Sequence, residues 1–498
     1  MRSFNRVSRK LSLLGIVALA GICFALDGQI GIHDPSTVIE SNGKYYVWGT
    51  GGTGLVSDDG WNWRRGANLP RRELAPDVIH IGDRFYIYTA TNVGAQPAAV
   101  VHMSWTKSLD PEDPNYKFED GGVVASSDGV EDSNAIDPGV FLDPKSGKLW
   151  LVYGSYFGYI RQVELDPKTG KRVIPNDKPR NLAINCEASD MMFHDGWYYL
   201  LATHGSCCRG ADSGYNIRMG RSRSVNGPFV DAEGVDMIQG GGKLLIGSEG
   251  RKIGPGHFGL LDLGDGVQKF SLHWEADLDR GGASVLDIRP LLWKDGWPVA
   301  GENLKENTYE LLSQRTGTAL ELAVEGMPVG GRPVRGPRPP SAPGAGAPQG
   351  PPGGMFAGTG GVIADQDVTQ VSKNWPSGDT DVRMANFLSQ AQQKWAVKAV
   401  PNVGGYPGAP YFKITIAGTD RALAATAQGE LVVVSTFTAT PEQLWRFDQL
   451  ADGSWRIMPK AIPNSKELLA LSAIGASSAT LSKFDPASDK QHWLIKLP

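Results

Sequence analysis

A short hairpin pattern recurs five times between residues 28 and 303, and it constrains the fold more than any other feature of the chain. Each copy has a head residue, a first strand, a turn rich in Gly and Asp, and a second strand with aromatic residues. The head lies eleven residues before the second strand in four copies and twelve residues before it in the third. The copies are DPSTVIESNGKYYVW from Asp34, LAPDVIHIGDRFYIY from Leu74, DPGVFLDPKSGKLWLVY from Asp137, EASDMMFHDGWYYLL from Glu187 and HFGLLDLGDGVQKFSL from His257.

The spacing of the copies predicts an all-β fold, a five-bladed β-propeller. Successive heads are 40, 63, 50 and 70 residues apart, and each interval suits one four-stranded blade. Short runs of Tyr, Trp and Val between Gly, Asp and Asn are typical of antiparallel strands. Because the innermost strand of each blade surrounds a central channel, we expect the five heads to meet at one mouth of that channel.

The heads combine three carboxylates with one imidazole, from Asp34, Asp137, Glu187 and His257. Each residue alone is explained by a turn, but four such groups around one funnel are costly to desolvate without a function. Inverting glycosidases use a carboxylic acid and a carboxylate about 6.5–9.5 Å apart. A third carboxylate near the acid raises its pKa by charge repulsion. The set therefore indicates glycoside hydrolysis.

Aromatic residues near the heads are candidates for stacking on sugar rings. Tyr156 and Phe157 lie in LVYGSYFGYI, and we predict substrate contacts from them and from Ser155 and Asn134. For Trp48 we predict hydrophobic packing between blades instead.

Motifs along the same region resemble glycoside hydrolase family 43, and more narrowly its arabinan endo-1,5-α-L-arabinanases. They occur in the order found in the family. They are HDPS (33–36), APDV (75–78), NAIDPGVF (134–141), LVYGSYFGYI (151–160), CEAS (186–189), CCRGADSGYNIRMGRSRSVNGPFVD (207–231), GGGKLL (240–245), GPGH (254–257) and IRPLLWKDGWPV (288–299).

The resemblance implies a role for each polar head. Asp34 would be the general base that activates water, Glu187 the general acid, and Asp137 the group that tunes the pKa of Glu187. His257 would help to hold a cation, commonly calcium, whose other ligands are mostly water. The implied substrate is plant cell-wall arabinan or a related arabinose-containing polysaccharide. An exo-acting α-L-arabinofuranosidase or β-xylosidase, and a non-catalytic carbohydrate-binding protein, are the alternatives.

The chain departs from the family pattern at three places. Leu74 stands where a Trp often precedes APD, and Phe258 replaces an Asn after the histidine. EASD replaces EAP, and it adds Asp190, a further acid to which the sequence assigns no role. These departures affect the expected sugar subsites and the endo or exo preference more than the hydrolytic chemistry.

Residues 1–25 have the pattern of a secretory signal peptide, with four basic residues before an apolar core of about 15 residues. That core is short for a membrane span, so we expect a secreted or periplasmic protein with no span after cleavage. Removal of the segment moves the formal charge from −4 to −8. An acidic, exported chain is a poor candidate for binding nucleic acid. We expect a monomer.

Three cysteines remain after the signal peptide: Cys186, Cys207 and Cys208. They are too few for a disulfide scaffold, and their spacing is not that of a zinc site. The adjacent pair matches a cysteine pair in the arabinanases. A disulfide between the two neighbours and a bridge to Cys186 are both compatible with the sequence.

The C-terminal part, residues 304–498, contains three units that each carry a Gln-x-Trp motif. The motifs are QKW (393–395), QLW (443–445) and QHW (491–493), and their Trp residues are 50 and 48 apart. They resemble a ricin-B-type β-trefoil, with the Pro/Gly-rich tract at about 326–360 as an insertion in the first repeat. Only Glu321 stands near the place of the usual lectin acid. A carbohydrate-binding module and a purely structural trefoil are both compatible with this pattern.

Overall fold

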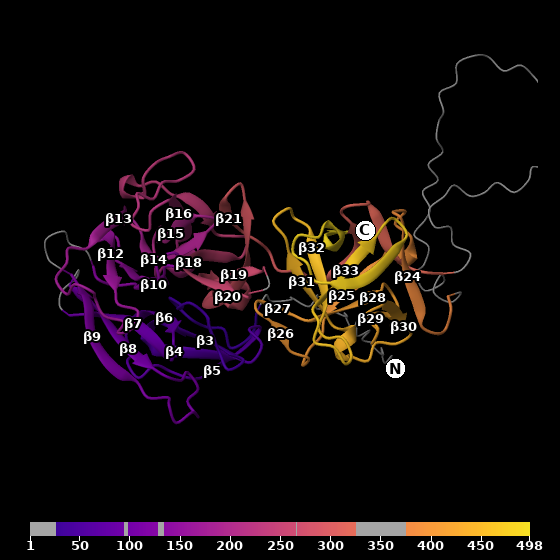
Figure 1. The fold of residues 1–498 in the computed structure, drawn as a ribbon, viewed down its shortest axis with the longest axis horizontal. Helices are drawn as coiled ribbons and strands as arrows, with labels where there is room; N and C mark the ends of the chain where they lie inside the picture. The colour runs from indigo at the N-terminus through magenta and orange to yellow at the C-terminus, as the bar shows by residue number, and fades with distance from the viewer. Residues whose placement is uncertain (1–25, 94–97, 128–133, 265, 325–374) are drawn as a thin grey trace, which may run out of the picture.

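The computed structural model describes residues 26–93, 98–127, 134–264, 266–324 and 375–498. These residues form two lobes that lie side by side, one built from strands β1 to β21 and the other from β22 to β35 (Figure 1). The helical elements of the described residues are seven 3-10 turns of three residues each, so the predicted all-β class is confirmed. The predicted signal peptide (1–25) and the Pro/Gly-rich tract (326–360) lie outside the described residues.

Five sheets of the first lobe form the blades of a β-propeller, which confirms the predicted fold. Each blade contains four consecutive antiparallel strands. Blade 1 has β2 (Ile39–Ser41), β3 (Lys44–Gly49), β4 (Thr53–Ser57) and β5 (Asn62–Arg65); blade 2 has β6 (Leu74–Ile81), β7 (Arg84–Asn92), β8 (Ala99–Thr106) and β9 (Glu119–Ser126). Blade 3 has β10 (Gly139–Leu142), β11 (Leu149–Tyr153), β12 (Tyr159–Leu165) and β13 (Arg180–Ile184). Blade 4 has β14 (Glu187–His194), β15 (Trp197–His204), β16 (Asn216–Ser222) and β17 (Lys243–Ile246); blade 5 has β18 (Lys252–Asp262), β19 (Gln268–Asp277), β20 (Ala283–Lys294) and β21 (Trp297–Ala300). The turns η1 (Thr50–Gly52), η2 (Gly210–Asp212), η3 (Met237–Gln239) and η4 (Leu278–Arg280) connect strands of this lobe.

The first described residues close the ring of blades. Strand β1 (Asp27–Gly28) adds to blade 1 by pairing in parallel with β5. A few residues later the chain reaches blade 5, where Gly31 forms a bridge with Val285 and the Leu286 N–H donates to the Ile30 carbonyl at 2.9 Å. Because one segment bonds to both blades, it joins the first blade to the last. The sequence pattern contained no signal for this closure.

Apolar side chains fill the spaces between neighbouring blades. Trp48 is fully buried in a cluster that joins Tyr46 of blade 1 to Val78 and Phe85 of blade 2. This confirms the predicted packing role of Trp48. The polar mouth of the channel is therefore supported by a set of apolar contacts around the ring.

The second lobe has a hydrophobic core of its own, which extends from Leu304 to Trp493. Each Trp of the three Gln-x-Trp motifs is fully buried and follows a 3-10 turn. The three indole N–H groups donate to main-chain carbonyls of Leu320, Leu423 and Leu471 at 2.9, 3.0 and 2.8 Å. The three motifs thus make the same contact in three places.

The strands of the second lobe are β22 (Asn307–Ser313), β23 (Thr318–Leu322), β24 (Thr380–Asn386), β25 (Trp395–Ala399), β26 (Gly405–Tyr406), β27 (Ala409–Pro410), β28 (Phe412–Ile416), β29 (Ala422–Ala425), β30 (Leu431–Val434), β31 (Trp445–Gln449), β32 (Trp455–Pro459), β33 (Leu469–Ile474), β34 (Ser478–Lys483) and β35 (Trp493–Lys496). Its 3-10 turns are η5 (Ala391–Gln393), η6 (Pro441–Gln443) and η7 (Asp489–Gln491). Ten of these strands form one sheet.

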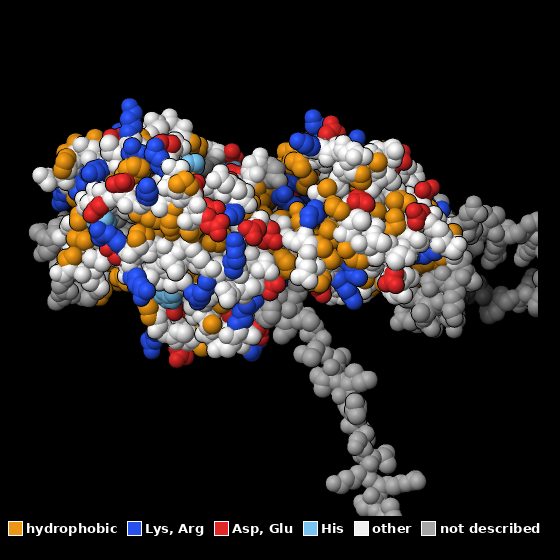
Figure 2. Space-filling model, turned by 90° about the horizontal axis from the view of Figure 1, so that it is seen from below, with side chains coloured by type: hydrophobic (Ala, Val, Ile, Leu, Met, Phe, Trp, Pro, Cys, Tyr) orange, Lys and Arg blue, Asp and Glu red, His pale blue; other side chains and the backbone are white. Residues whose placement is uncertain are grey.

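The outer surface carries charges of both signs. On the face shown in Figure 2, Lys and Arg side chains are interspersed with Asp and Glu side chains over both lobes. This mixture gives the described part of that face no continuous basic track of the kind that follows a nucleic-acid backbone. In the described residues, no helix has the length and apolar character needed to cross a membrane.

Candidate active site

In each blade, one non-glycine residue in the left-handed region of φ lies within the innermost strand or within the five residues before it. These residues are Asp34 (51°), Ala75 (38°), Asp137 (51°), Ala188 (48°) and His257 (55°). Such a conformation costs on the order of 1–3 kcal/mol per residue and is common at functional sites. The shared geometry shows that Asp34, Asp137 and His257 occupy equivalent positions in their blades.

Glu187 and Leu74 come one residue before this equivalent position. Bulges interrupt the register between Leu74 and Asp77 in β6, between Glu187 and Asp190 in β14, and between Gly256 and Gly259 in β18. Glu187 therefore corresponds to Gly256 and not to His257. The alignment of five equivalent heads is wrong by one residue in blades 2 and 4, because the hairpin lengths conceal the bulges.

The same register explains the position of Asp190, which is equivalent to Asp77 of APDV. Both acids are buried and line a small cavity of about 20 Å³ inside the channel, together with Asp137 and His257. Asp77 accepts main-chain N–H groups of Thr37 and Val140. Burial, followed by the charge of Asp77, holds the pKa of Asp190 well above its usual range. Asp190 is therefore an acid of the channel interior.

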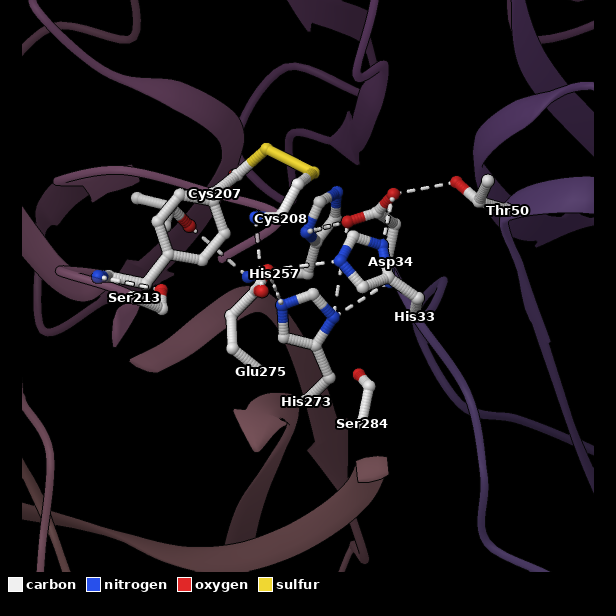
Figure 3. Close-up of polar contacts among 12 residues, drawn as sticks. His33, Asp34, Thr50, Cys207, Cys208, Ser213, His257, His273, Glu275 and Ser284 are labelled. Carbon is white, nitrogen blue, oxygen red and sulfur yellow. Dashed lines mark hydrogen bonds and ion pairs between the residues drawn. A yellow bond between two sulfur atoms is a disulfide. The ribbon is translucent and has the colours of Figure 1, made fainter. Parts of the chain in front are cut away.

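Asp34 lies at the centre of a polar cluster (Figure 3). Its Oδ2 accepts the Thr50 hydroxyl at 2.6 Å and lies 2.8 Å from His33 Nδ1, and its Oδ1 lies 3.3 Å from His257 Nδ1. Its main-chain N–H donates to His273 Nδ1 at 2.7 Å. Burial alone would raise the pKa of Asp34, but His257, the hydrogen bond from His33, and His273 outweigh it and lower that pKa below its usual range. Asp34 is therefore an ionised carboxylate.

Glu187 has the opposite ionisation tendency. It is buried, and its Oε1 accepts a short hydrogen bond from the Tyr215 hydroxyl. Burial raises the pKa of Glu187 to about 7, although the Tyr215 hydrogen bond opposes the shift, and the charge of Asp34 adds to it. A carboxyl group with this pKa is largely protonated in mildly acidic solution and can donate a proton.

Asp137 lies against the main chain of Glu187. Its Oδ2 accepts the Ala188 N–H at 3.2 Å. Burial, then the charges of Glu187 and Asp34, hold the pKa of Asp137 well above its usual range. The structure thus brings the three predicted acids into one electrostatically linked group from blades 1, 3 and 4.

The predicted substrate-binding residues fall into two groups. Tyr156 and Phe157 are 38% and 54% exposed, and the Tyr156 hydroxyl donates to the carbonyl of Thr203, the strand partner of Glu187. Ser155 and Asn134 are each 1% exposed, so they lie beneath the surface. The exposed pair has the better access to a sugar, and substrate contact stays a prediction for all four residues.

His257 has a nitrogen available for a cation. Its Nε2 is buried and has no hydrogen-bond partner among the described residues, whereas its Nδ1 faces Asp34 Oδ1 at 3.3 Å. Ligand atoms of His33, Asp34 and His273 also lie within 4.8 Å of one another, but the ring nitrogens that His33 and His273 turn toward this group already face carboxylates or a main-chain N–H. The residues therefore fit a cation that takes one ligand from His257 and is otherwise hydrated.

The adjacent cysteines form a disulfide with each other, and Cys186 is a buried free thiol. This decides between the two pairings that the sequence allowed. In Figure 3 the disulfide lies beside the cluster of Asp34 and His257.

Sequence reasoning missed four residues that shape this site: His33, Tyr215, His273 and Glu275. His273 and Glu275 alternate with apolar residues on β19, where Lys269 and Ser271 continue the polar face and the whole central part of the strand is buried. The available signal was the alternation of polar and apolar residues along this strand, which indicates that one face of a buried strand is polar. Tyr215 and His33 stand within the family motifs, but their residue types alone indicate no role in the reaction.

The comparisons with known proteins agree with this geometry. Residues 44–298, just over half of the chain, match the model of Glycosyl hydrolases family 43. The chain belongs to this family. The family 43 match covers Asp137 and Glu187, begins ten residues after Asp34, and ends before the second lobe.

Relatives of the chain include two extracellular proteins. An exo-α-(1→5)-L-arabinofuranosidase of Cellvibrio japonicus is 31% identical over 59% of this chain and 92% of the relative. An endo-α-(1→5)-L-arabinanase of Bacillus subtilis is 28% identical over 54% of this chain and 87% of the relative.

Two solved structures are similar to the propeller lobe. An exo-1,5-α-L-arabinanase from a bovine ruminal metagenomic library has a TM-score of 0.51 with 31% identity, and covers 56% of this chain and 100% of its own. The α-L-arabinanase of Cellvibrio cellulosa, in complex with arabinohexaose, has a TM-score of 0.50 with 29% identity over 55% of this chain and 96% of its own.

Proposed function

We propose that this family 43 protein is a secreted inverting glycosidase that hydrolyses α-1,5-L-arabinofuranosidic bonds in arabinan. The observation that carries the proposal is the opposite ionisation of Asp34 and Glu187. An ionised carboxylate and a carboxyl with a pKa near 7 are the pair that inversion requires. Two relatives support the linkage and the location, because one is named an extracellular exo-α-(1→5)-L-arabinofuranosidase and the other an extracellular endo-α-(1→5)-L-arabinanase.

In the proposed reaction, Asp34 removes a proton from a water molecule as the water oxygen bonds to the anomeric carbon. The glycosidic C–O bond breaks on the opposite face of the sugar, and Glu187 donates its proton to the leaving oxygen. Asp137 would favour the protonated form of Glu187 by charge repulsion, because the two carboxyl groups interact electrostatically. Tyr156 and Phe157 would supply the stacking surface.

The relatives include both exo-acting and endo-acting enzymes, so the site is compatible with either mode. We propose endo cleavage as the first candidate, because the motifs resemble those of the arabinan endo-1,5-α-L-arabinanases. An exo-acting α-L-arabinofuranosidase or β-xylosidase on the same scaffold is the second candidate.

We also propose that calcium, or another hydrated cation, binds at His257. The orphaned Nε2 of His257 would be the protein ligand, and the cation would supply a fixed positive charge beside the acids.

For the second lobe we propose a β-trefoil that spans residues 304–498 and follows a propeller over 28–303. The three equivalent indole contacts and the separate core support it. Glu321 does not serve as a lectin acid in this arrangement, because it is 2% exposed and accepts hydrogen bonds from Arg383 and Gln393 at 2.7 and 2.9 Å. A structural trefoil fits this site better than a sugar pocket.

The test is Glu187→Gln, measured by chromatography of the products from linear arabinan. Loss of the general acid should lower kcat by about 10²–10⁴-fold while the fold is retained. Early release of mixed oligosaccharides indicates endo cleavage, and release of arabinose alone indicates exo cleavage.

Asp190→Asn is the matched control, since it makes the same acid-to-amide change on the same strand. Its activity should stay near the original value, because burial holds the pKa of Asp190 well above its usual range and so favours the neutral form that the amide resembles. A Glu187→Gln protein that retains full activity would refute the assignment of the acid. If the unmodified protein releases neither oligosaccharides nor arabinose, the proposed function is wrong.

A further inference from the structure

Glu275 on β19 is a buried carboxylate that divides its two oxygens between two different parts of the site. The residue is 4% exposed. Its Oε1 lies 3.0 Å from His33 Nε2, and its Oε2 accepts the main-chain N–H of Cys208 at 3.0 Å (Figure 3). Among the described residues, its ion-pair partners are His33 and, at 3.8 Å, His273. Glu275 therefore connects the His33 ring to the disulfide loop.

The His33 ring connects Glu275 to Asp34. Its Nε2 faces Glu275 and its Nδ1 lies 2.8 Å from Asp34 Oδ2, so both ring nitrogens donate to carboxylates. Burial lowers the pKa of His33, but the hydrogen bonds to Asp34 and Glu275 raise it to about 10 overall. A ring held at both ends by charge-assisted hydrogen bonds is fixed in orientation.

The other end of the connection is the Cys207–Cys208 disulfide. A bond between neighbouring residues restricts the main chain at this point, and Cys208 has a φ of 60°. That conformation directs the Cys208 N–H to Glu275. Without the disulfide, Cys208 would be a non-glycine residue in the left-handed region with no covalent restraint, and we expect its main chain to relax.

We propose that Glu275 is a positioning residue for the general base, and that the Cys207–Cys208 disulfide loop holds Glu275 in place. The contacts run from the Cys208 N–H through Glu275 and His33 to Asp34. Glu275 touches neither water nor sugar in the reaction, and it acts by fixing the carboxylate that does. This inference rests on the proposed role of Asp34.

The first test is Glu275→Gln, assayed on linear arabinan and on an aryl arabinofuranoside with a good leaving group. The amide cannot accept from both His33 and Cys208, so the Asp34 carboxylate loses its orientation. We expect kcat to fall by about 10–100-fold on both substrates with KM nearly unchanged. Glu187→Gln should instead lose much less on the aryl substrate, because a good leaving group needs no proton.

Asp287→Asn is the matched control. Asp287 is a buried acid on the neighbouring strand β20, where it accepts from Lys252 and Trp274 at 2.8 and 2.9 Å. Its loss should lower the thermal midpoint without changing kcat at 25 °C. If Glu275→Gln behaves in the same way, Glu275 is merely structural and the proposal fails.

A second readout does not require turnover. In ¹⁵N NMR spectra of the histidine-labelled full chain, Glu275→Gln should shift the Nε2 and Nδ1 signals of His33, and Asp287→Asn should not. Unchanged His33 signals would overturn the positioning role. If the unmodified protein is inactive on both substrates but the His33 signals shift, the proposed function fails and the connection stands.

The third test uses a dithiol such as dithiothreitol. The dithiol is oxidised to its cyclic disulfide, and two electrons and two protons convert the Cys207–Cys208 bond into two thiols, which mass spectrometry after alkylation counts. We expect kcat to fall several-fold, which is less than the roughly 10²-fold loss that a 1 Å misplacement of a reacting group can cause. The double variant Cys207→Ser, Cys208→Ser should have the lowered kcat and no response to dithiol, whereas Cys186→Ser should still respond. Full kcat with both new thiols present would overturn the role of the disulfide.

Discussion

The hydroxyl group of Tyr215 limits how far burial raises the pKa of Glu187. It donates to Glu187 Oε1, and a donor stabilises the carboxylate form and so lowers the pKa. Burial acts in the opposite direction and is the larger effect, with a resulting pKa of about 7. The proton that the leaving oxygen needs is therefore present below about pH 7 and is lost as the pH rises through that value.

Tyr215→Phe should move the alkaline limb of the kcat profile to higher pH. Removal of the donor destabilises the Glu187 carboxylate, and a hydrogen bond to a charged group contributes about 1.5–3 kcal/mol, which corresponds to roughly one or two pKa units. Hydrolysis of an unactivated arabino-oligosaccharide, measured from pH 5 to 9, checks the shift.

Tyr199→Phe is the control for this pH shift. It removes a buried tyrosine hydroxyl from the same blade, but that hydroxyl donates to the Gly296 carbonyl at 2.6 Å and not to an acid. Its pH profile should match that of the unmodified protein. A limb that stays in place in Tyr215→Phe would show that another group sets it.

The polar heads were identifiable from sequence, and their supporting residues were not. Asp34, Asp137 and Glu187 stand in motifs of consecutive residues, which can be recognised without a structure. The contact between His33 and Glu275 joins residues 242 positions apart, and its geometry depends on the closure of the ring. A carboxylate on a buried strand has many possible partners until the blades are placed.

The hairpins were the elements that the sequence predicted best, because each combines a turn signal with two alternating strands. The bulges in β6, β14 and β18 were not predicted. An extra residue in a strand can be offset by a loop that is one residue shorter, so the total length of the hairpin does not reveal the bulge. Strand β1 was also missed, because two residues give no periodicity. The missed bulges account for the alignment of Glu187 with His257. The missed strand β1 accounts for the absence of any prediction of how the ring closes.

In the second lobe, the Gln-x-Trp turns should contribute stability through the indole N–H as well as through packing. Trp445→Phe removes the donor to the Leu423 carbonyl and leaves that buried acceptor without its partner. We expect a loss of about 1–3 kcal/mol from the free energy of unfolding beyond the packing cost. Urea denaturation monitored by circular dichroism measures it.

Trp375→Phe separates packing from hydrogen bonding. Trp375 is buried in the same core, and its indole nitrogen has no hydrogen-bond partner among the described residues. It should therefore lose only packing and cost less than Trp445→Phe. Equal losses from the two variants would mean that the repeated indole contacts add nothing to stability.

The two lobes meet at the seam of the propeller. The hairpin of β26 and β27 lies near blades 1 and 5 (Figure 1), where the Gly408 N–H donates to the Gly60 carbonyl at 3.0 Å and the Lys269 ammonium donates to the Pro407 carbonyl. Gly60 belongs to blade 1 and Lys269 to blade 5. One hairpin of the second lobe therefore bonds to both sides of the seam that the first described residues close.

Gly408→Ala should weaken this junction and lower the thermal midpoint of the propeller. A Cβ atom at Gly408, where φ is 85°, would lie 2.7 Å from the Ile288 carbonyl oxygen of blade 5. Gly404→Ala in the same hairpin has nearly the same backbone cost, since its φ is 80°, but its Cβ would meet nothing nearer than 3.6 Å. The difference between the variants isolates the contact, and forced overpacking costs about 1–3 kcal/mol. Differential scanning calorimetry should show a lower propeller transition for Gly408→Ala than for Gly404→Ala, with kcat at 25 °C unchanged in both. Identical transitions would mean that the hairpin rests on the seam without stabilising it, and that the propeller depends on its own first strand for closure.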